Sequence, residues 1–388
     1  TLLHDRDIEV ACDDSVIRTN PVGPIFIRRA RGYVPKALDA SHLPARRVLA
    51  LGADLKVTPT TLNRGEMVVG RHIGNLDNIR TEAAFRTEIQ RVLTFAQLTP
   101  EVVAVDLHPE MFSVLYAEEV FADRELIRVQ HHHAHLAAVL FEHRFDPAEE
   151  VLGIVLDGMG YGPDGTIWGG EVLVGSCQHF QRVGHLRPVP QPGGDKAAIE
   201  PKRMATSLLL EAGLEEHPAF DSDFAQICSV RTVSPLSSST GRLFDGVAAI
   251  IGIAPSQQSY EGQAPALLEA LVDPSCTDAY PLPNDGNELD TRVLIAALVD
   301  DKAGPGTRAA RFHHGLADGL ANLALQQNPT KVVLAGGSMV NRPLAHRIAQ
   351  KLGDAGCKVY SPQQLPAGDG GLSAGQAAVA ACTCATAQ

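Results

Sequence analysis

The feature that most constrains the fold of this chain is a strand–turn–strand unit at residues 152–174. Residues 152–156 form an apolar run that predicts a buried strand, and this strand delivers Asp157 to a glycine-rich turn. The chain returns over 166–174 as a second strand. A shorter unit of the same kind begins at Val48, passes through a Gly/Asp turn that contains Lys56, and returns towards Leu62. Two such hairpins, roughly a hundred residues apart, indicate two comparable lobes.

The other segments complete an α/β pattern. Residues 1–46 read as short strands between polar turns, and so short a segment cannot bury a core of its own, so we expect it to be an appendage. The predicted order after it is a helix from about 81, a strand at 102–106, a mainly helical part with a loop at 270–290, helix 308–326, strand 331–335, turn 336–341, helix 342–352, strand 358–360 and a last helix opened by 368–375. Two strand-hairpins followed by a late Gly-Gly turn predict an actin-like ATPase fold, in which two lobes clamp a nucleotide.

Histidine spacing predicts a metal site. His131 and His135 are four residues apart and precede an apolar helical pattern, so both imidazoles leave one helix face. Two histidines leave a coordination shell incomplete, and Asp157 and Asp369 are the best-placed carboxylates to complete it. Such a mixed set suits zinc or iron(II) better than magnesium. The histidine run by itself leaves a second interpretation open, a solvated helix face.

The hairpin turns predict an anion site, with a simpler interpretation beside it. Backbone N–H groups of the first turn and the Lys56 ammonium could meet a phosphate together, or the hairpin could merely carry a solvated lysine. In the second turn Asp157, Asp164 and Glu171 surround several glycines, which favours ligand binding over glycines that only supply positive φ. Asp245 could reach ribose hydroxyls or be simply exposed.

Charge and cysteine content exclude several classes. The chain has 33 basic and 45 acidic residues, a net charge of −12, which argues against a duplex nucleic-acid binder. It shows no apolar run long enough for a membrane span and no signal-peptide pattern, so we expect a cytoplasmic protein without a membrane partner. Its seven cysteines contain no Cys-x-x-Cys pair, only Cys382 and Cys384 are close in sequence, and free thiols are predicted.

Together these motifs resemble the HypF family, the carbamoyltransferases of hydrogenase maturation. The segments that carry the resemblance are Asp13-Asp14-Ser15-Val16, Arg28-Arg29-Ala30-Arg31-Gly32-Tyr33, Leu55-Lys56, His72-Ile73-Gly74, 130–135, 157–171, Gly241-Arg242-Leu243-Phe244-Asp245, Tyr260-Glu261-Gly262-Gln263-Ala264 and Asp369-Gly370-Gly371-Leu372. They span nearly the whole chain, and the run 157–171 is the most specific.

The resemblance implies a domain layout. Residues 1–46 would be the tail of a YrdC-like domain, and 47–388 an actin-like domain similar to the threonylcarbamoyladenosine-synthesis protein. Its first lobe would cover about 47–150 plus the C-terminal helix, and its second lobe about 151–365. The acylphosphatase and zinc-finger domains of full-length members have no counterpart here, so we expect a short form or a piece of a longer protein.

The resemblance also implies an activity. A carbamoyl group, derived from carbamoyl phosphate and ATP through carbamoyl adenylate, would pass to the C-terminal cysteine of HypE as the precursor of cyanide ligands of [NiFe]-hydrogenase. Predicted cofactors are ATP and one divalent ion, iron(II) or zinc, with magnesium accompanying ATP. The implied metal ligands are His131, His135, Asp157 and Asp369. The predicted catalytic residues are Lys56, Asp164 and Arg203. The predicted nucleotide site is Lys56, Gly158, Gly160, Gly162, Gly241, Asp245, Glu261, Gly336, Gly337 and Asn341.

Two other functions stay open at this point. An actin-like ATPase or sugar kinase would use carboxylate-held magnesium and no histidine pair. A scaffold that binds HypE and nucleotide would depend on a full-length paralogue for the early steps.

Overall fold

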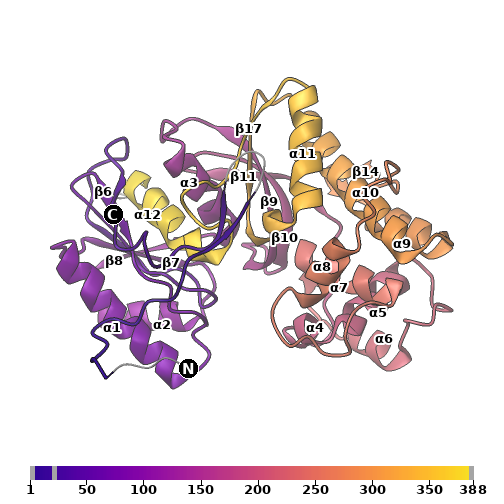
Figure 1. Cartoon of the computed structure of the whole chain (residues 1–388), viewed down its shortest axis with the longest axis horizontal. Helices are drawn as coiled ribbons and strands as arrows, with labels where there is room; N and C mark the ends of the chain where they lie inside the picture. The colour runs from indigo at the N-terminus through magenta and orange to yellow at the C-terminus, as the bar shows by residue number, and fades with distance from the viewer. Residues whose placement is uncertain (1–4, 20–23, 384–388) are drawn as a thin grey trace.

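A computed structural model describes residues 5–19 and 24–383 of the chain, so Cys384 lies outside the described residues. Two lobes lie side by side, each built on its own β-sheet (Figure 1). The first lobe is defined by a six-stranded sheet of order β3-β6-β5-β4-β7-β8. Its strands are β3 (Leu38–Asp39), β4 (Val48–Ala50), β5 (Thr60–Asn63), β6 (Glu66–Val69), β7 (Val102–Asp106) and β8 (Glu125–Val129).

The second lobe is defined by a nine-stranded sheet, whose main path runs β14-β15-β11-β10-β9-β16-β17. Its strands are β9 (Val151–Tyr161), β10 (Ile167–Gly175), β11 (Phe180–Leu186), β12 (Val189–Pro190), β13 (Leu236–Ser237), β14 (Asn284–Asp285), β15 (Glu288–Leu289), β16 (Lys331–Ala335) and β17 (Lys358–Tyr360).

The helices can be grouped by the lobe whose strands they follow in the chain. Those that follow first-lobe strands are α1 (Ile79–Phe95), α2 (Phe112–Val120) and α3 (His131–Glu142). Those that follow second-lobe strands are α4 (Lys196–Ile199), α5 (Pro201–Glu211), α6 (Ser222–Cys228), α7 (Thr240–Ile251), α8 (Gln263–Ala270), α9 (Thr291–Asp300), α10 (Pro305–Leu325), α11 (Arg342–Asp354) and α12 (Leu372–Cys382), with short 3₁₀ turns η1 (Gly337–Val340) and η2 (Asp369–Gly371).

The two sheets share one topology. In the first lobe the path β6-β5-β4-β7-β8 has antiparallel pairs up to β4 and parallel pairs from β4 onwards. The path β11-β10-β9-β16-β17 of the second lobe has the same order and the same directions. This duplication explains why two hairpins of one kind occur in the sequence, since each opens one lobe.

The last helix of each lobe packs against the other lobe. Helix α3 follows β8 of the first lobe but contacts β9, β10 and β16, whereas α12 follows β17 of the second lobe and contacts β4, β5 and β7. Figure 1 shows the yellow α12 among the indigo and purple elements of the first lobe, beside α3. The α3–α12 pair is therefore the joint between the lobes, and chain segments far apart in sequence meet there.

Strand alternation separates the core into layers. In β4 and β7, Val48 and Val102 join the core around α3 and α12, whereas their neighbours Leu49 and Val103 face the core around α1 and α2. Because successive side chains of a strand point to opposite faces, a continuous apolar run buries both faces of the sheet. Among the described residues, no helix is both long enough and apolar enough to span a membrane.

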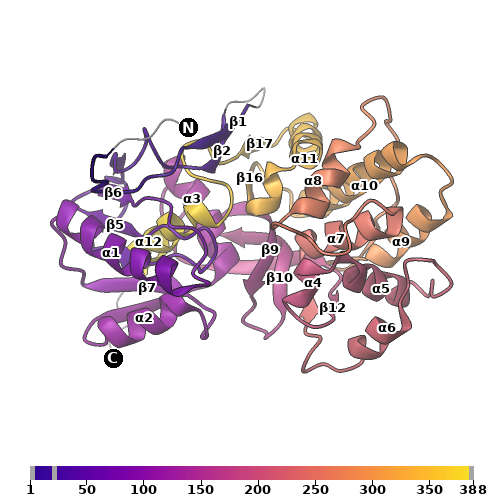
Figure 2. The same ribbon diagram turned by 60° about the horizontal axis from the view of Figure 1, so that its bottom comes forward.

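Residues 5–19 and 24–36 form an arm that contacts both lobes. Its strands β1 (Val16–Arg18) and β2 (Ile25–Arg28) pair antiparallel and lie above the gap between the lobes in Figure 2. Arg18 pairs with Glu269 of α8 at 2.6 Å, while Arg91 of α1 donates to the Glu9 carbonyl. The predicted appendage is thus packed on the rest of the chain, and its YrdC-like origin stays a prediction.

The predicted loop at 270–290 is wrong in one respect. It contains β14 and β15, and β15 extends the second-lobe sheet by pairing with β11. Strand β15 has two residues, of which only Leu289 is deeply buried, so the sequence shows no hydrophobic periodicity that would predict it. The predicted helices and strands after 300 are confirmed with shifts of up to three residues at their ends.

Candidate metal centre

Helix α3 places two histidines at one point. Gln130 caps its N-terminus, because the Gln130 side chain accepts a hydrogen bond from the His133 backbone N–H at 2.9 Å. His131 and His135 then lie one turn apart, and their side chains are only 2% exposed. This burial excludes the solvated helix face that the sequence left open.

The carboxylates come from the second lobe and from the start of α12. Asp157 was expected at the beginning of a turn, but β9 continues to Tyr161, so Asp157 lies inside the strand. Its Oδ1 accepts hydrogen bonds from the backbone N–H groups of Gly158, at 2.8 Å, and Gly337, at 3.3 Å, which leaves Oδ2 facing α3. Asp369 arrives on η2, directly before α12.

The four side chains converge. Oδ2 of Asp157 lies 3.2 Å from Nε2 of His131 and 3.0 Å from Nε2 of His135, and Oδ1 of Asp369 lies 3.5 Å from each of these nitrogens. All four ligand atoms lie within 4.8 Å of one another. Ligands held about 2.0–2.1 Å from a tetrahedral ion are about 3.3 Å apart. The donor set and its spacing therefore fit a zinc or iron(II) ion.

Asp106 is a site residue that the sequence prediction missed. It ends β7, is fully buried, and its Oδ2 lies 2.8 Å from Nδ1 of His131. A carboxylate on the far nitrogen orients an imidazole and fixes which nitrogen faces a metal. The signal was present, since β7 ends in an aspartate after an apolar run, as residues 152–157 do.

Replacing Asp106 by asparagine is expected to lower the affinity for a divalent ion by about 10- to 100-fold, because a neutral amide holds the His131 ring less firmly. Competition with a chromophoric chelator measures this affinity, and circular dichroism checks the fold. Unchanged metal affinity would mean that Asp106 serves only the backbone N–H of His108, which donates to its Oδ1 at 3.0 Å.

The cluster is strongly ionic. Burial by itself lowers the pKa of His131, but Asp106, Asp157 and Asp369 outweigh it and hold that pKa well above its usual value. His135 shows the same balance between burial and the two carboxylates beside it, with a raised pKa. Burial raises the pKa of Asp157, but the hydrogen bonds from the two imidazoles are stronger and hold it well below its usual range. Without an ion, the imidazoles therefore retain protons between the carboxylates.

Metal affinity is expected to increase with pH through and beyond pH 6.5, the ordinary histidine value, because the ion must displace protons from imidazoles whose pKa is raised. Titration of zinc in weakly buffered solution should release protons at neutral pH, and fewer as the pH rises. Affinity that is constant from acidic to alkaline pH would contradict this ligand set.

A cavity of about 340 Å³ opens beside the cluster and lies between the lobes. Asp157 and Asp369 form part of its wall. The predicted nucleotide residues that line it are Lys56, Gly158, Gly241, Glu261, Gly337 and Asn341. Nζ of Lys56, from the first lobe, pairs with Oε2 of Glu261, from the second, at 2.6 Å. Burial lowers the pKa of Lys56, but Asp369, Glu261 and Asp157 outweigh it, so the pKa is raised and the ammonium charge is retained.

Two arginines of the cavity wall were not predicted as site residues. Arg18 comes from the arm, and Arg242 comes from the first turn of α7. Arg242 is buried and pairs with Asp245 at 2.8 Å. Asp245 lies behind Arg242, outside the cavity wall, and burial raises its pKa to about 6 against the opposing effect of Arg242. Arg242 therefore lines the cavity, whereas Asp245, three residues later in α7, does not.

Other predicted site residues lie away from the cavity. Gly160 packs against His132, since a Cβ at residue 160 would lie 2.5 Å from the imidazole ring. Gly336 directly precedes Gly337 and has a φ of 92°. Gly162 and Asp164 form the hairpin turn, where Asp164 accepts hydrogen bonds from Trp168 and Thr166.

Arg203, in α5, pairs with Glu200 at 2.6 Å and stacks over Phe224. Neither Asp164 nor Arg203 lines the cavity beside the metal cluster, and their catalytic roles stay predictions.

Comparisons with known proteins agree with this geometry. The family model "HypF Kae1-like domain" matches residues 44–142, and "Carbamoyltransferase, Kae1-like Domain, second subdomain" matches residues 153–376. "Carbamoyltransferase HypF" of Rhizobium leguminosarum bv. viciae is 41% identical over 97% of this chain and 50% of its own length. A "Carbamoyltransferase HypF homolog" of Cupriavidus necator is 37% identical over 88% of this chain and 92% of its own length.

A solved structure described as full-length HypF in the phosphate- and nucleotide-bound form has a TM-score of 0.90 and 34% identity, covering 97% of this chain and 52% of that one. The chain thus spans about half the length of this structure and of the R. leguminosarum relative. The matches confirm the predicted two-lobed, actin-like α/β fold.

Proposed function

Because this chain belongs to the HypF carbamoyltransferase family, we propose that it transfers a carbamoyl group from carbamoyl adenylate to the C-terminal cysteine of HypE. Carbamoyl phosphate and ATP would be the sources of the adenylate, and the thiocarbamate would be the precursor of a hydrogenase cyanide ligand. The observation that carries this proposal is the buried cluster of His131, His135, Asp157 and Asp369, which lies beside a cavity. The wall of this cavity includes Asp157, Asp369, Lys56 and Arg242.

The proposed roles of the individual residues follow from their positions in and beside the cavity wall. A divalent ion on the four ligands would polarise the carbamoyl carbonyl. Lys56 and Arg242, which line the cavity, would hold the phosphate charge of the adenylate. Lys56 would have to exchange Glu261 for that phosphate. Gly158, Gly241 and Gly337 offer backbone without side chains, which allows close approach of the nucleotide.

The transfer itself needs no nucleophile from this chain. The acceptor thiolate attacks the carbamoyl carbon, a C–S bond forms, the C–O bond to the phosphate breaks, and AMP leaves with the bonding electrons. The thiol proton goes to solvent as the thiolate forms. A mixed anhydride is already activated, so shielding it from water and orienting it are the main demands on the protein.

The test is mass spectrometry of purified HypE after incubation with the metal-loaded chain. One arm supplies ATP and carbamoyl phosphate. The other adds a full-length HypF whose own histidine pair has been replaced, as a source of carbamoyl adenylate. Modification in both arms supports an autonomous enzyme, and modification in the second arm alone supports transfer that needs the adenylate made elsewhere. A folded, metal-loaded chain that leaves HypE unmodified in both arms would sink the transferase proposal and favour the scaffold.

A further inference from the structure

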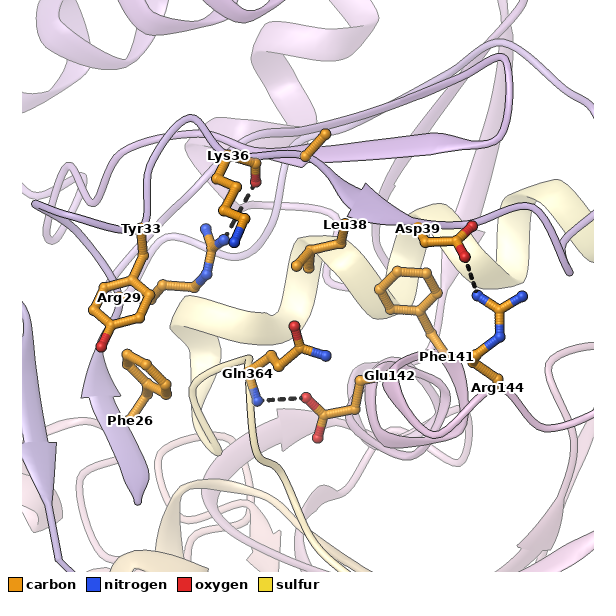
Figure 3. A pocket seen from close by; sticks show the side chains of 11 residues that line it. Phe26, Arg29, Tyr33, Lys36, Leu38, Asp39, Phe141, Glu142, Arg144 and Gln364 are labelled. Atoms are coloured by element: carbon orange, nitrogen blue, oxygen red, sulfur yellow. Dashed lines mark hydrogen bonds and ion pairs between the residues drawn. The ribbon is translucent and has the colours of Figure 1, made fainter. Parts of the chain in front are cut away.

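A second cavity, distinct from the metal centre, lies between the arm and the C-terminal end of α3. It has a volume of about 420 Å³ (Figure 3). Phe141 and Glu142 of α3 form one side, and Arg29, Tyr33 and Lys36 of the arm form the other. Helix α3 begins at the metal ligand His131, so about ten residues, or about 15 Å of helix, separate the two sites.

Arg29 is the unusual member of this cavity. It is only 3% exposed, its Nη1 has no hydrogen-bond partner, and its Nη2 makes one long hydrogen bond, 3.4 Å, to the Lys36 carbonyl. Over residues 5–19 and 24–383, no carboxylate forms an ion pair with Arg29 or with Lys36. Burial lowers the pKa of this guanidinium, as expected for a cation without a counter-charge. A buried, unpaired guanidinium is costly unless an anion joins it.

The two acidic residues of the cavity, Asp39 and Glu142, already have partners within the protein. Asp39 pairs with Arg144, at 2.5 Å. Glu142 accepts three backbone hydrogen bonds, from Gln363 at 2.7 Å, Gln364 at 2.9 Å and Leu365 at 3.1 Å. Of the three cations that line the cavity, Arg144 has a carboxylate partner, whereas the buried Arg29 and the exposed Lys36 have none among the described residues.

The remaining lining is aromatic and apolar. The rings of Phe26 and Tyr33 meet edge to face, with centroids 4.7 Å apart, and Leu38 and Phe141 lie further along the cavity (Figure 3). Such a surface takes the flat or apolar body of a small molecule, while a few charged groups fix its orientation. A phosphate monoester carries between one and two negative charges at neutral pH, so it would supply the counter-charge that the buried Arg29 lacks.

We propose that this cavity binds a small phosphorylated molecule, with Arg29 and Lys36 holding the phosphate and Phe26 and Tyr33 contacting the organic body. The site is independent of the proposed carbamoyl transfer, since none of its cationic residues lines the metal cavity. Among the residues that the structure describes, Phe26 alone contributes to the walls of both cavities.

The experiment is a calorimetric titration of the metal-loaded chain with phenyl phosphate, inorganic phosphate and benzoate. Phenyl phosphate should bind most tightly, inorganic phosphate more weakly because it lacks the ring, and benzoate weakest because it has a single charge. Arg29→Gln removes a charge-assisted contact and is expected to weaken the binding of phenyl phosphate by about tenfold or more. Lys36→Gln should weaken this binding less.

A control variant assigns the binding to this cavity. Arg31→Gln changes an exposed arginine of the same arm, which contacts Asp14 and the Cys12 carbonyl, and should leave binding unchanged. Binding that is lost equally in Arg31→Gln, or kept in both Arg29→Gln and Lys36→Gln, would overturn the proposal.

A further measurement uses the unaltered chain, in case Arg29→Gln folds poorly. Saturating phenyl phosphate should protect Lys36 from acetylation several-fold, as measured by peptide mass spectrometry, and leave the exposed Lys302 of the second lobe as reactive as before. Equal reactivity of Lys36 with and without phenyl phosphate would count against the site.

Discussion

A chain with His135 replaced by alanine is expected to lose metal binding. His135 supplies one of only four ligand atoms, and its Nε2 lies 3.0 Å from Oδ2 of Asp157 and 3.5 Å from Oδ1 of Asp369. Loss of an outer partner of a metal ligand costs about 10- to 100-fold in affinity, so loss of the ligand itself should cost more. Metal content after dialysis, measured by inductively coupled plasma mass spectrometry, should fall from one ion per chain to a trace.

His133→Ala is the matched control. His133 is buried on the same helix but points away from the cluster, where its Nε2 lies 2.8 Å from the Ser176 carbonyl oxygen. Its loss should lower the thermal midpoint but leave one ion per chain. If His133→Ala and His135→Ala lost the metal equally, the cause would be damage to α3, and the ligand assignment would lose its support.

The second large effect concerns Gly375 of α12. A Cβ built at this position would lie 1.8 Å from the Ala134 carbonyl oxygen and 2.7 Å from its carbon. Both are backbone atoms, so no rotamer change relieves the clash, and the helices must separate. Overpacking typically costs about 1–3 kcal/mol. Gly375→Ala should reach at least the upper end of that range and also reduce metal binding, because α3 carries two ligands and α12 follows the fourth.

Gly353→Ala supplies the contrast. Gly353 lies in α11, has an ordinary φ, and a Cβ added there would have no neighbouring atom within 4 Å. Alanine there should be neutral or stabilising by up to about 1 kcal/mol. Calorimetric unfolding of both variants tests the difference. Similar midpoints for the two variants would show that α3 and α12 tolerate separation, contrary to the packing described.

The site could be predicted from the sequence where local spacing determines geometry. An i, i+4 pair on a helix shares one face, so His131 and His135 were identified without any tertiary information. Asp157 and Asp369 were selected because each lies in a glycine-rich segment and two histidines need carboxylates to complete a coordination shell. The structure brings these four side chains together, and their role as metal ligands stays a prediction.

The sequence interpretation was incomplete where tertiary contacts decide the position of a side chain. Asp164 belongs to the same glycine-rich run as Asp157, but the strand extends to Tyr161 and carries it into the hairpin turn. Arg203 was selected from a helical segment whose orientation no periodicity reveals. Asp106 was overlooked because its importance depends on β7 ending beside α3. Likewise, the matching topology of the two sheets is invisible as a sequence repeat, since only strand order and direction are shared.

The crossing of α3 and α12 between the lobes has a consequence for biosynthesis. On the ribosome, the first-lobe strands emerge long before α12, and Val48, Val102 and their neighbours on one face of that sheet lack their partner until then. The nascent chain therefore exposes this apolar surface while the second lobe is synthesised. The ligand set is also incomplete until Asp369 has been made, so an ion that needs all four ligands can bind only late in folding.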